Sequence, residues 1–375
     1  MPRRPIDTTE LTIGRPIRFN AYDARGNVLL SYGQIIQTVA QRDMLLQNGL
    51  FYGSDEECRS PLPPQLAEPS LSPLARVLDA RRRLHALLTD PEPTDFPIAL
   101  AGIAAQVREA CRTNPDVTLA SMLLRTEGPY SSRHAVNAAI ACQITSAALE
   151  LEPDESIATV SAALTMNIGM FALHDVLATR KAPLTDTQQA AVRGHCEAGV
   201  ARLRELGIDD ERWLEAVGDH HERSDGSGYP TGKHGDDIGQ PARLLAVADV
   251  YCARVAGRDY RPPLQSTQAL RWMFLNEGAA LDMNMAKVFI KTLGIYPPGT
   301  GVRLRNGSIA VVIQRGTAGH QPVVASLTTH NGLRLASPIR RGGDVDAHTI
   351  VEVVNLWQLG MPVSMEALWG ADAVD

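Results

Sequence analysis

Apolar residues recur at helical spacing over most of the chain between residues 75 and 294. Alanine and leucine return every three to four positions there, as they do in helices that bury one face. We predict helices near residues 75–90, 95–112, 133–150, 155–173, 186–206, 211–221, 241–256 and 265–277. The pattern favours a mainly α fold in which several helices pack around a central site.

The pattern changes on both sides of this helical region. Residues 1–53 combine an alternating segment, a turn and a helix that Thr38 would cap and Gly49 would end, which predicts a small α/β module. Residues 54–74 hold five prolines and no periodicity, so we expect a linker. The helical domain would span 75–295. Short apolar runs and an Asn-Gly turn predict a small β unit with a tail over 296–375.

Composition and charge narrow the class of protein. A chain of 375 residues is long enough for two or three units with buried cores. No run of about 18 apolar residues and no apolar segment after the basic start are present, so we expect neither membrane insertion nor secretion. The net charge of −6 argues against duplex nucleic acid as a partner. Five scattered cysteines suit a reducing cytoplasm and are interpreted as inert thiols.

The most informative stretch is His220-His221-Glu222, followed by a six-residue loop motif. The stretch resembles the signature of the HD-GYP family of the HD superfamily, and the resemblance covers roughly residues 125–295. The family pattern HDIGKxxxPDxILxKPGxLT also lies without gaps over Met166–Thr185. This resemblance implies a helical domain that holds two or three metal ions, usually iron or manganese, and hydrolyses cyclic di-GMP. The loop motif is Asp225, Gly226, Ser227, Gly228, Tyr229 and Pro230.

Five metal-ligand positions follow from the resemblance. His134 matches the first ligand histidine, and His195, with Gly199 four residues later, matches the second. His220 and His221 match the paired histidines, and Asp249 matches the final aspartate. Outside the family frame each has an ordinary interpretation, because a lone histidine is usually a hydrogen-bonded core or surface residue and an aspartate often caps a helix.

Three positions at the centre of the pattern depart from the family. Met166 replaces a ligand histidine, Asn167 replaces the aspartate that bridges two metals, and Met170 replaces the lysine that faces the substrate phosphate. Tyr130 stands where members with three metals have a glutamate. A neutral amide and a soft thioether are poor substitutes at a hard binuclear centre. We therefore expect at most one divalent ion (iron, manganese or zinc).

A nearby dipeptide, His174-Asp175, offers a replacement for the missing pair. On a continuous helix, eight positions move a side chain about 12 Å along the axis and rotate it by about 80°. In the family frame these two residues belong to a turn. The sequence therefore argues against their acting as ligands.

The resemblance supports three functions. The first is a degenerate HD-GYP signalling protein in the cytoplasm, inactive as a phosphodiesterase, that binds cyclic di-GMP or a partner protein. HD-GYP domains as a class contact GGDEF-domain cyclases, so a partner of that kind is expected. The alternative is an active metal-dependent phosphodiesterase with an altered site, and the third is a scaffold whose terminal modules bind. We predict that the loop motif, with Arg243 and Arg261, forms the binding surface, with Tyr229 as an exposed anchor; a plain turn between helices is the ordinary interpretation.

Overall fold

The computed structural model describes residues 71–257, 263–277, 280–316, 321–342 and 345–375, with short stretches among the first 52 residues. The chain divides into two compact units, residues 1–70 with 92–102, and residues 71–91 with 103–375. Each unit is described by itself. The expected site lies in the second unit.

The first unit contains a small antiparallel sheet and a helix. Its strands β1 (Arg4–Pro5), β2 (Ala21–Tyr22), β3 (Val28–Leu30) and β4 (Phe51–Tyr52) are ordered β1-β4-β2-β3. Helix α1 (Val39–Gln47) begins directly after Thr38. The predicted α/β module is confirmed, although Gly49 and residues 54–70 of the predicted linker lie outside the described residues. Its buried core contains Leu11, Ile17, Ala21, Leu30, Ile36 and Leu45.

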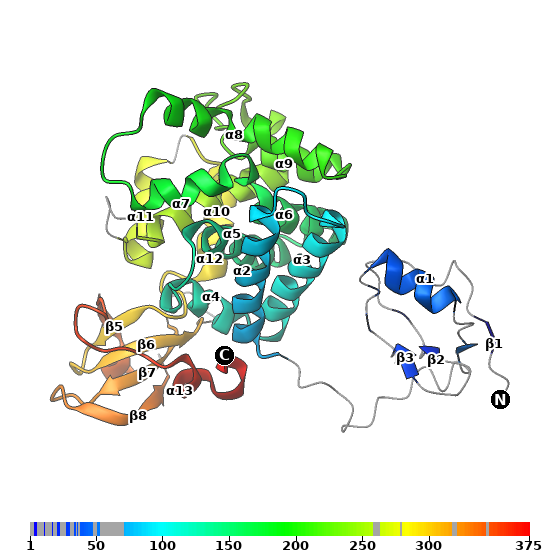
Figure 1. Cartoon of the computed structure of the whole chain (residues 1–375). Coiled ribbons are helices and arrows are strands. Elements are labelled where there is room, and N and C mark those ends of the chain that lie inside the picture. The colour runs from blue at the N-terminus through cyan, green and yellow to red at the C-terminus, as the bar shows by residue number, and fades with distance from the viewer. Residues whose placement is uncertain are drawn as a thin grey trace. The chain divides into compact units, whose positions relative to one another are not determined.

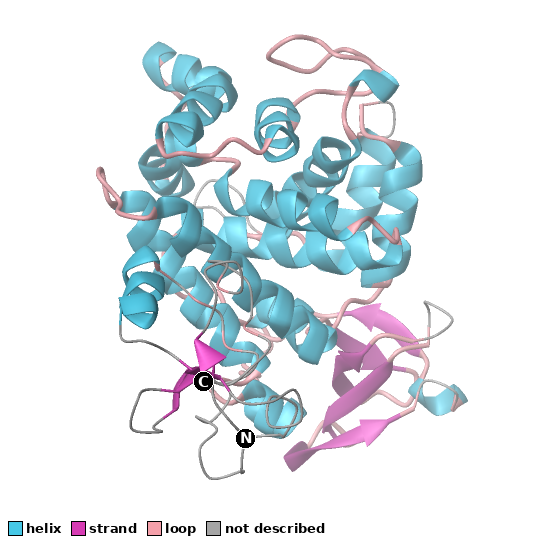
Figure 2. Ribbon diagram, turned by 90° about the vertical axis from the view of Figure 1, so that its right-hand side faces the viewer, coloured by secondary structure: helices cyan, strands magenta, loops and turns pink. Residues whose placement is uncertain are grey.

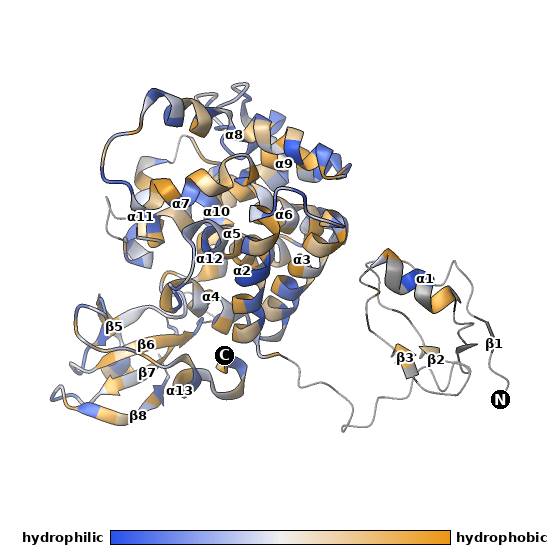
Figure 3. Ribbon diagram, viewed as in Figure 1, coloured by the Kyte–Doolittle hydropathy of each residue, from blue (hydrophilic) through white to orange (hydrophobic). Residues whose placement is uncertain are grey.

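The second unit begins with α2 (Pro73–Thr89), whose sequence sets both its start and its buried face. The Ser72 hydroxyl accepts a hydrogen bond from the Ala75 amide at 3.0 Å and so caps the helix. Val77 and Leu84, seven positions apart, are buried, whereas Arg82 and Arg83 are exposed. Figure 3 shows both hydrophobic and hydrophilic stretches on this helix.

The remaining helices build a mainly α domain, as predicted (Figures 1 and 2). Helix α5 lies at its centre, because it contacts α2, α4, α6, α7, α10 and α12 and most of its residues are buried. Two short helices, α4 and α12, were not predicted. The bounds are α3 (Phe96–Thr113), α4 (Pro115–Leu124), α5 (Tyr130–Ala148), α6 (Pro153–Thr165), α7 (Phe171–Thr179), α8 (Asp186–Glu205), α9 (Glu211–Asp219), α10 (Gln240–Val255), α11 (Ser266–Asn276) and α12 (Met283–Leu293).

The predicted single helix over residues 155–173 is wrong. The chain leaves α6 after Thr165, makes the short 3-10 helix η3 (Ile168–Met170) and continues as α7. A Cβ atom at Gly169 would lie 2.3 Å from the His195 carbonyl oxygen. The backbone of η3 therefore rests directly on α8, a contact that periodicity along one segment does not report.

The apolar stretch Pro153–Thr179 also passes the length and composition test for a membrane span. Of its most apolar window, 67% is buried inside the protein. It contains the break at η3 and packs against α5, α8 and α9. These features are those of a core segment.

A five-stranded antiparallel sheet follows the helices, as predicted, and lies at one end of the helical stack (Figure 2). Its order is β8-β7-β6-β5-β9, and Gly307, with φ of 89°, makes the predicted turn between β5 and β6. The following helix α13 (Met365–Trp369) packs Met365 against Leu74 of α2 and Val117 of α4. The strands are β5 (Gly301–Leu304), β6 (Ile309–Gln314), β7 (Val323–Thr328), β8 (Arg334–Arg341) and β9 (Ile350–Val353).

Candidate metal centre and cleft

The five predicted ligand positions come from four separate helices or helix ends. His134 lies on α5, His195 on α8, His220 and His221 at the end of α9, and Asp249 on α10. His134 Nε2 lies 2.7 Å from Asp249 Oδ1, and His195 Nε2 lies 3.2 Å from His220 Nε2. His221 and Asp249 line the same cleft. The fold therefore brings these residues into one neighbourhood.

The hydrogen bonds of His195 and His220 fix how their rings present nitrogen. Each Nδ1 donates to a carbonyl three residues earlier, to Val192 at 2.6 Å and to Val217 at 2.7 Å. In a neutral ring this leaves a lone pair on Nε2. The two lone pairs then face each other across 3.2 Å in a buried space. Two acceptors in this arrangement are suited to a shared cation.

Burial keeps these histidines neutral. It lowers the pKa of His195 to about 4, helped by the nearby His220. It lowers the pKa of His220 to about 3 and that of His221 to about 4. Burial would raise the pKa of Asp249, but hydrogen bonding to His134 and the neighbouring histidines bring it well below its usual range. Neutral imidazoles and a carboxylate are the protonation states that bind a divalent ion.

These donors fit one metal ion better than two. His195, His220 and His221 supply three neutral nitrogen donors that would hold a single divalent ion, and such an ion would supply Lewis acidity wherever a coordination position is left open to a ligand. At the positions expected to complete a second site, Met166 is fully buried with a thioether, and Asn167 carries a neutral amide. Asp249 is the one carboxylate among the described residues that line the cleft.

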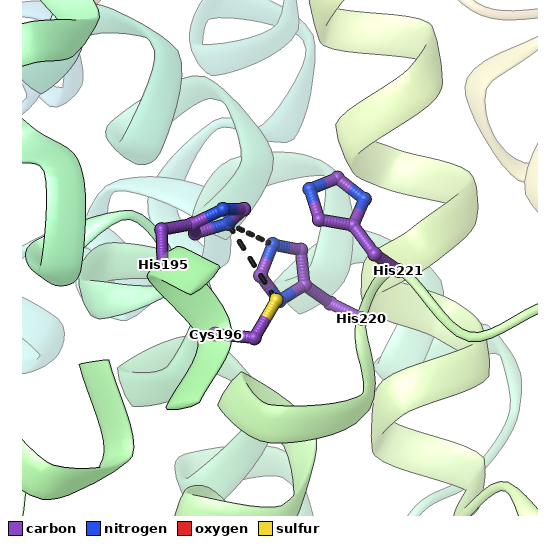
Figure 4. Close-up of side chains that lie close together, drawn as sticks. All are labelled: His195, Cys196, His220 and His221. Atoms are coloured by element: carbon purple, nitrogen blue, oxygen red, sulfur yellow. Dashed lines mark hydrogen bonds between the residues drawn. The ribbon is translucent and has the colours of Figure 1, made fainter. Parts of the chain in front are cut away.

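Cys196 joins the histidines, although the sequence argument counted it as an inert thiol. Its Sγ lies 3.7 Å from His195 Nε2 and 3.8 Å from His220 Nδ1. Figure 4 shows Cys196 and the three histidines converging from α8 and from the end of α9. A single cysteine has no CxxC spacing to mark it. The available signal was its position directly after a ligand histidine.

The His174-Asp175 dipeptide is not in a turn, contrary to expectation. Both residues lie within α7, and because the chain breaks at η3 the continuous-helix argument does not apply. The His174 ring packs edge-on against His134, with centroids 5.3 Å apart, and lines the cleft. Asp175 instead accepts hydrogen bonds from the amide and hydroxyl of Ser131 at the start of α5. His174 therefore lies at the site, whereas Asp175 stabilises the start of α5.

Glu222 organises the loop that follows the paired histidines. It is 2% exposed, and its carboxylate accepts hydrogen bonds from the backbone amides of Thr231, Gly232 and Lys233 and from the Thr231 hydroxyl. A buried carboxylate needs such partners, because leaving it unpaired is costly. Glu222 thus ties the far end of the loop to the chain beside His221.

Two glycines of the loop motif are required by geometry. Gly226 has φ of 78°, and the His234 ring fills the space where a Cβ would lie. A Cβ at Gly228 would lie 2.4 Å from the Arg223 amide nitrogen. Asp225 and Ser227 are exposed and hydrogen-bonded to each other, and the Tyr229–Pro230 peptide is cis.

Tyr229 is not the exposed anchor that the sequence suggested. It is half-buried, and its ring lies over His221 with centroids 4.9 Å apart. It lines the cleft that His221 and Asp249 also line. The aromatic face is therefore turned toward the interior of the site.

The structure describes one of the two arginines of the predicted binding surface. Arg243 forms ion pairs with Asp236 at 3.1 Å and with Asp282, the N-cap of α12, at 3.0 Å. These contacts give it a role in holding α10 to α12. Arg261 lies outside the described residues.

The cleft has a volume of about 540 Å³. Asn167, Met170, His221, Tyr229 and Asp249 line it, and so do Arg180 and Lys181 from the segment between α7 and α8. Among the described residues neither of these two cations is ion-paired; Arg180 donates only to the carbonyls of Ala182 and Pro183. Neither residue was predicted for the site, although the family pattern laid over Met166–Thr185 has a lysine at the position of Arg180. Their signal was two adjacent cations ten residues beyond the lost lysine position.

A mainly helical domain that gathers histidines and an aspartate from several helices has the arrangement expected of an HD-type domain. Residues 118–285 match the HD domain family. This match covers less than half of the chain, and the likeness of the helical part to HD-GYP proteins is supported by the relatives below.

Two relatives of known name are phosphodiesterases of cyclic dinucleotides. The chain is 32% identical over 204 residues to a cyclic di-GMP phosphodiesterase, PA4108, of Pseudomonas aeruginosa, covering 54% of this chain and 49% of that protein. It is 27% identical to 3'3'-cGAMP-specific phosphodiesterase 3 of Vibrio cholerae, covering 48% of this chain and 39% of that protein. The chain thus spans half or less of these relatives.

The fold resembles that of Bd1817, an HDG"Y"P protein from Bdellovibrio bacteriovorus. The TM-score is 0.50 at 15% identity, covering 77% of this chain and 98% of that one. This likeness concerns the fold alone.

Proposed function

We propose that this chain is a signalling protein that binds cyclic di-GMP, or a close cyclic dinucleotide, in the cleft without hydrolysing it. The observation that carries the proposal is the charge of the cleft lining, which has one carboxylate, Asp249, and two cations, Arg180 and Lys181. Such a lining favours an anionic ligand and disfavours two metal ions.

The energetic reason lies in the separation of the ions. Two-metal phosphodiesterases hold their ions about 3.5 to 4 Å apart. Two divalent charges about 4 Å apart repel by roughly 16 kcal/mol at an effective dielectric of 20. Anionic bridges must offset that repulsion, and Asn167 carries no charge. We infer that the bridged hydroxide nucleophile of such enzymes does not form here.

A phosphate group in the cleft would have other partners. Arg180 and Lys181 supply charge that the Met170 side chain lacks, and Tyr229 offers an aromatic face for a base. Binding would then be reported to a partner protein, which we expect to be a GGDEF-type or other signalling protein in the cytoplasm.

The rival function is an active phosphodiesterase with an altered site. It is favoured by the gathering of all five ligand positions in one neighbourhood and by the names of the relatives. The two functions differ in whether product appears.

The test titrates cyclic di-GMP against the purified full chain by calorimetry and analyses the same samples for linear product by chromatography. We expect binding without product. The double variant Arg180→Ala with Lys181→Ala should bind about tenfold more weakly, since a charge-assisted hydrogen bond is worth about 1.5 kcal/mol or more. Lys287→Ala, an exposed lysine on α12, is the matched control. Product above that of a His220→Ala variant would support the rival, and absence of binding would reject the ligand.

A further inference from the structure

We propose that His195, Cys196, His220 and His221 form a closed, four-ligand zinc site in which the Cys196 thiolate is a ligand. The four residues each offer one donor atom, and these atoms all lie within 4.8 Å of one another. The inference goes beyond the proposed function and does not depend on whether a nucleotide enters the cleft.

The first argument is the separation of the donor atoms. A tetrahedral zinc ion with Zn–N about 2.05 Å and Zn–S about 2.3 Å places two nitrogens about 3.3 Å apart and a nitrogen and a sulfur about 3.6 Å apart. His195 Nε2 and His220 Nε2 are separated by 3.2 Å, and Cys196 Sγ and His195 Nε2 by 3.7 Å. Two edges of the tetrahedron are therefore already present. Cys196 Sγ also lies 3.8 Å from His220 Nδ1, and the donor atoms of all four residues lie within 4.8 Å of one another.

The second argument is the orientation of the histidines. His195 and His220 both use Nδ1 for a backbone carbonyl, which aims both Nε2 lone pairs at the same space. The backbone carbonyls of Val192 and Val217 also fix the ring planes, as outer partners of metal-bound histidines do. Both rings and the Cys196 side chain are fully or almost fully buried.

The thiolate determines which metal is expected. A cysteine ligand with imidazoles suits zinc, whereas manganese prefers carboxylate and water oxygens. On binding, the thiol releases its proton and a Zn–S bond forms. Four protein ligands leave no open position for water, which is the arrangement of structural zinc sites. The ion would clamp α8 to the end of α9, directly before the loop that Glu222 holds.

The test uses the unmodified full chain, purified after growth with zinc, iron and manganese all supplied. Elemental analysis should find one zinc per chain. X-ray absorption at the zinc edge should show one sulfur at about 2.3 Å with nitrogens at about 2.0 to 2.1 Å. A shell of nitrogen and oxygen alone, two ions per chain, or no tightly held ion would each overturn the proposal.

A variant test isolates the sulfur. Cobalt(II) loaded in place of zinc should give a thiolate-to-cobalt charge-transfer band, which Cys196→Ser should lose and Cys111→Ser, at another buried cysteine, should keep. A band that survives Cys196→Ser would reject the thiolate ligand. If Cys196→Ser does not fold, the absorption spectrum of the unmodified chain still decides the question.

Discussion

The Glu222 carboxylate accepts hydrogen bonds from both the amide and the hydroxyl of Thr231, at 2.6 and 2.7 Å. These contacts connect the residue after the paired histidines to the residue after the loop motif. The loop is therefore closed by a buried charge.

This closure predicts that Glu222→Gln destabilises the protein. The glutamine amide would place a donor against backbone donors of Thr231, Gly232 and Lys233, and an unsatisfied buried group costs about 1 to 3 kcal/mol. Urea denaturation should show a lower midpoint by that free energy. Glu215→Gln, on the exposed side of α9, should leave the midpoint unchanged. Equal effects of the two variants would contradict the proposed closure.

Gly228→Ala should distort the loop. Its Cβ would lie 2.4 Å from backbone nitrogen of Arg223, which cannot move as a side-chain end can, and overpacking costs about 1 to 3 kcal/mol. Gly194→Ala is the contrasting control, since its helix position has open space and alanine favours a helix by about 0.5 to 1 kcal/mol. Thermal unfolding should therefore shift in opposite directions. This also means that Gly228→Ala cannot serve as a fold-neutral probe of binding.

Tyr229→Ala should weaken binding of cyclic di-GMP while leaving the fold intact. The ring lines the cleft and lies over His221, and loss of base stacking on an aromatic costs about 1 to 3 kcal/mol. That corresponds to roughly ten- to hundredfold in affinity. Calorimetric titration measures it, and circular dichroism checks the fold. An unchanged affinity would move the ligand away from Tyr229.

The unmodified chain should not turn over cyclic di-GMP with added manganese or ferrous iron. The reason is that Met166, Asn167 and Met170 are uncharged and supply neither a bridging carboxylate nor a lysine, and product formation above a His220→Ala control would contradict the prediction. The triple variant Met166→His, Asn167→Asp and Met170→Lys should gain a second metal ion, measured by elemental analysis. Because the backbone of η3 lies against α8 at Gly169, it has little room to move after the substitutions, so we expect the new side chains to occupy the positions of the old ones.

Removing the metal should lower stability. A ligand at a thousand times its Kd stabilises the native state by about 4 kcal/mol. Scanning calorimetry with a chelator should show a lower transition temperature that added zinc restores and added magnesium does not. A transition that ignores the chelator would argue against a bound ion.

Much of this architecture could be predicted from the sequence, and the failures have physical causes. Helical periodicity reports burial of one face, so the long helices and the strand pattern after Tyr296 were found. The break at Gly169 depends on α8, far away in the sequence, and no local pattern reports it. The ligand positions followed from a family resemblance, and Arg180 stands at a lysine of the same pattern, whereas the contact of Cys196 with His220 arises only when α8 and α9 pack together. Tyr229 was misplaced because aromatic character alone does not say which side of a loop is covered.

The backbone contact between Gly169 and His195 separates shape from charge in this cleft. This contact fixes the main chain beneath Asn167 and Met170, whereas the side chains of these two residues line the cleft. An active enzyme and a protein that only binds the nucleotide can therefore share the same backbone structure at this site. They differ in the charge and polarity of the side chains that line the cleft. Compounds chosen only to fit that backbone structure would not distinguish the active enzyme from the binding protein. Compounds that carry a metal-chelating group would distinguish them.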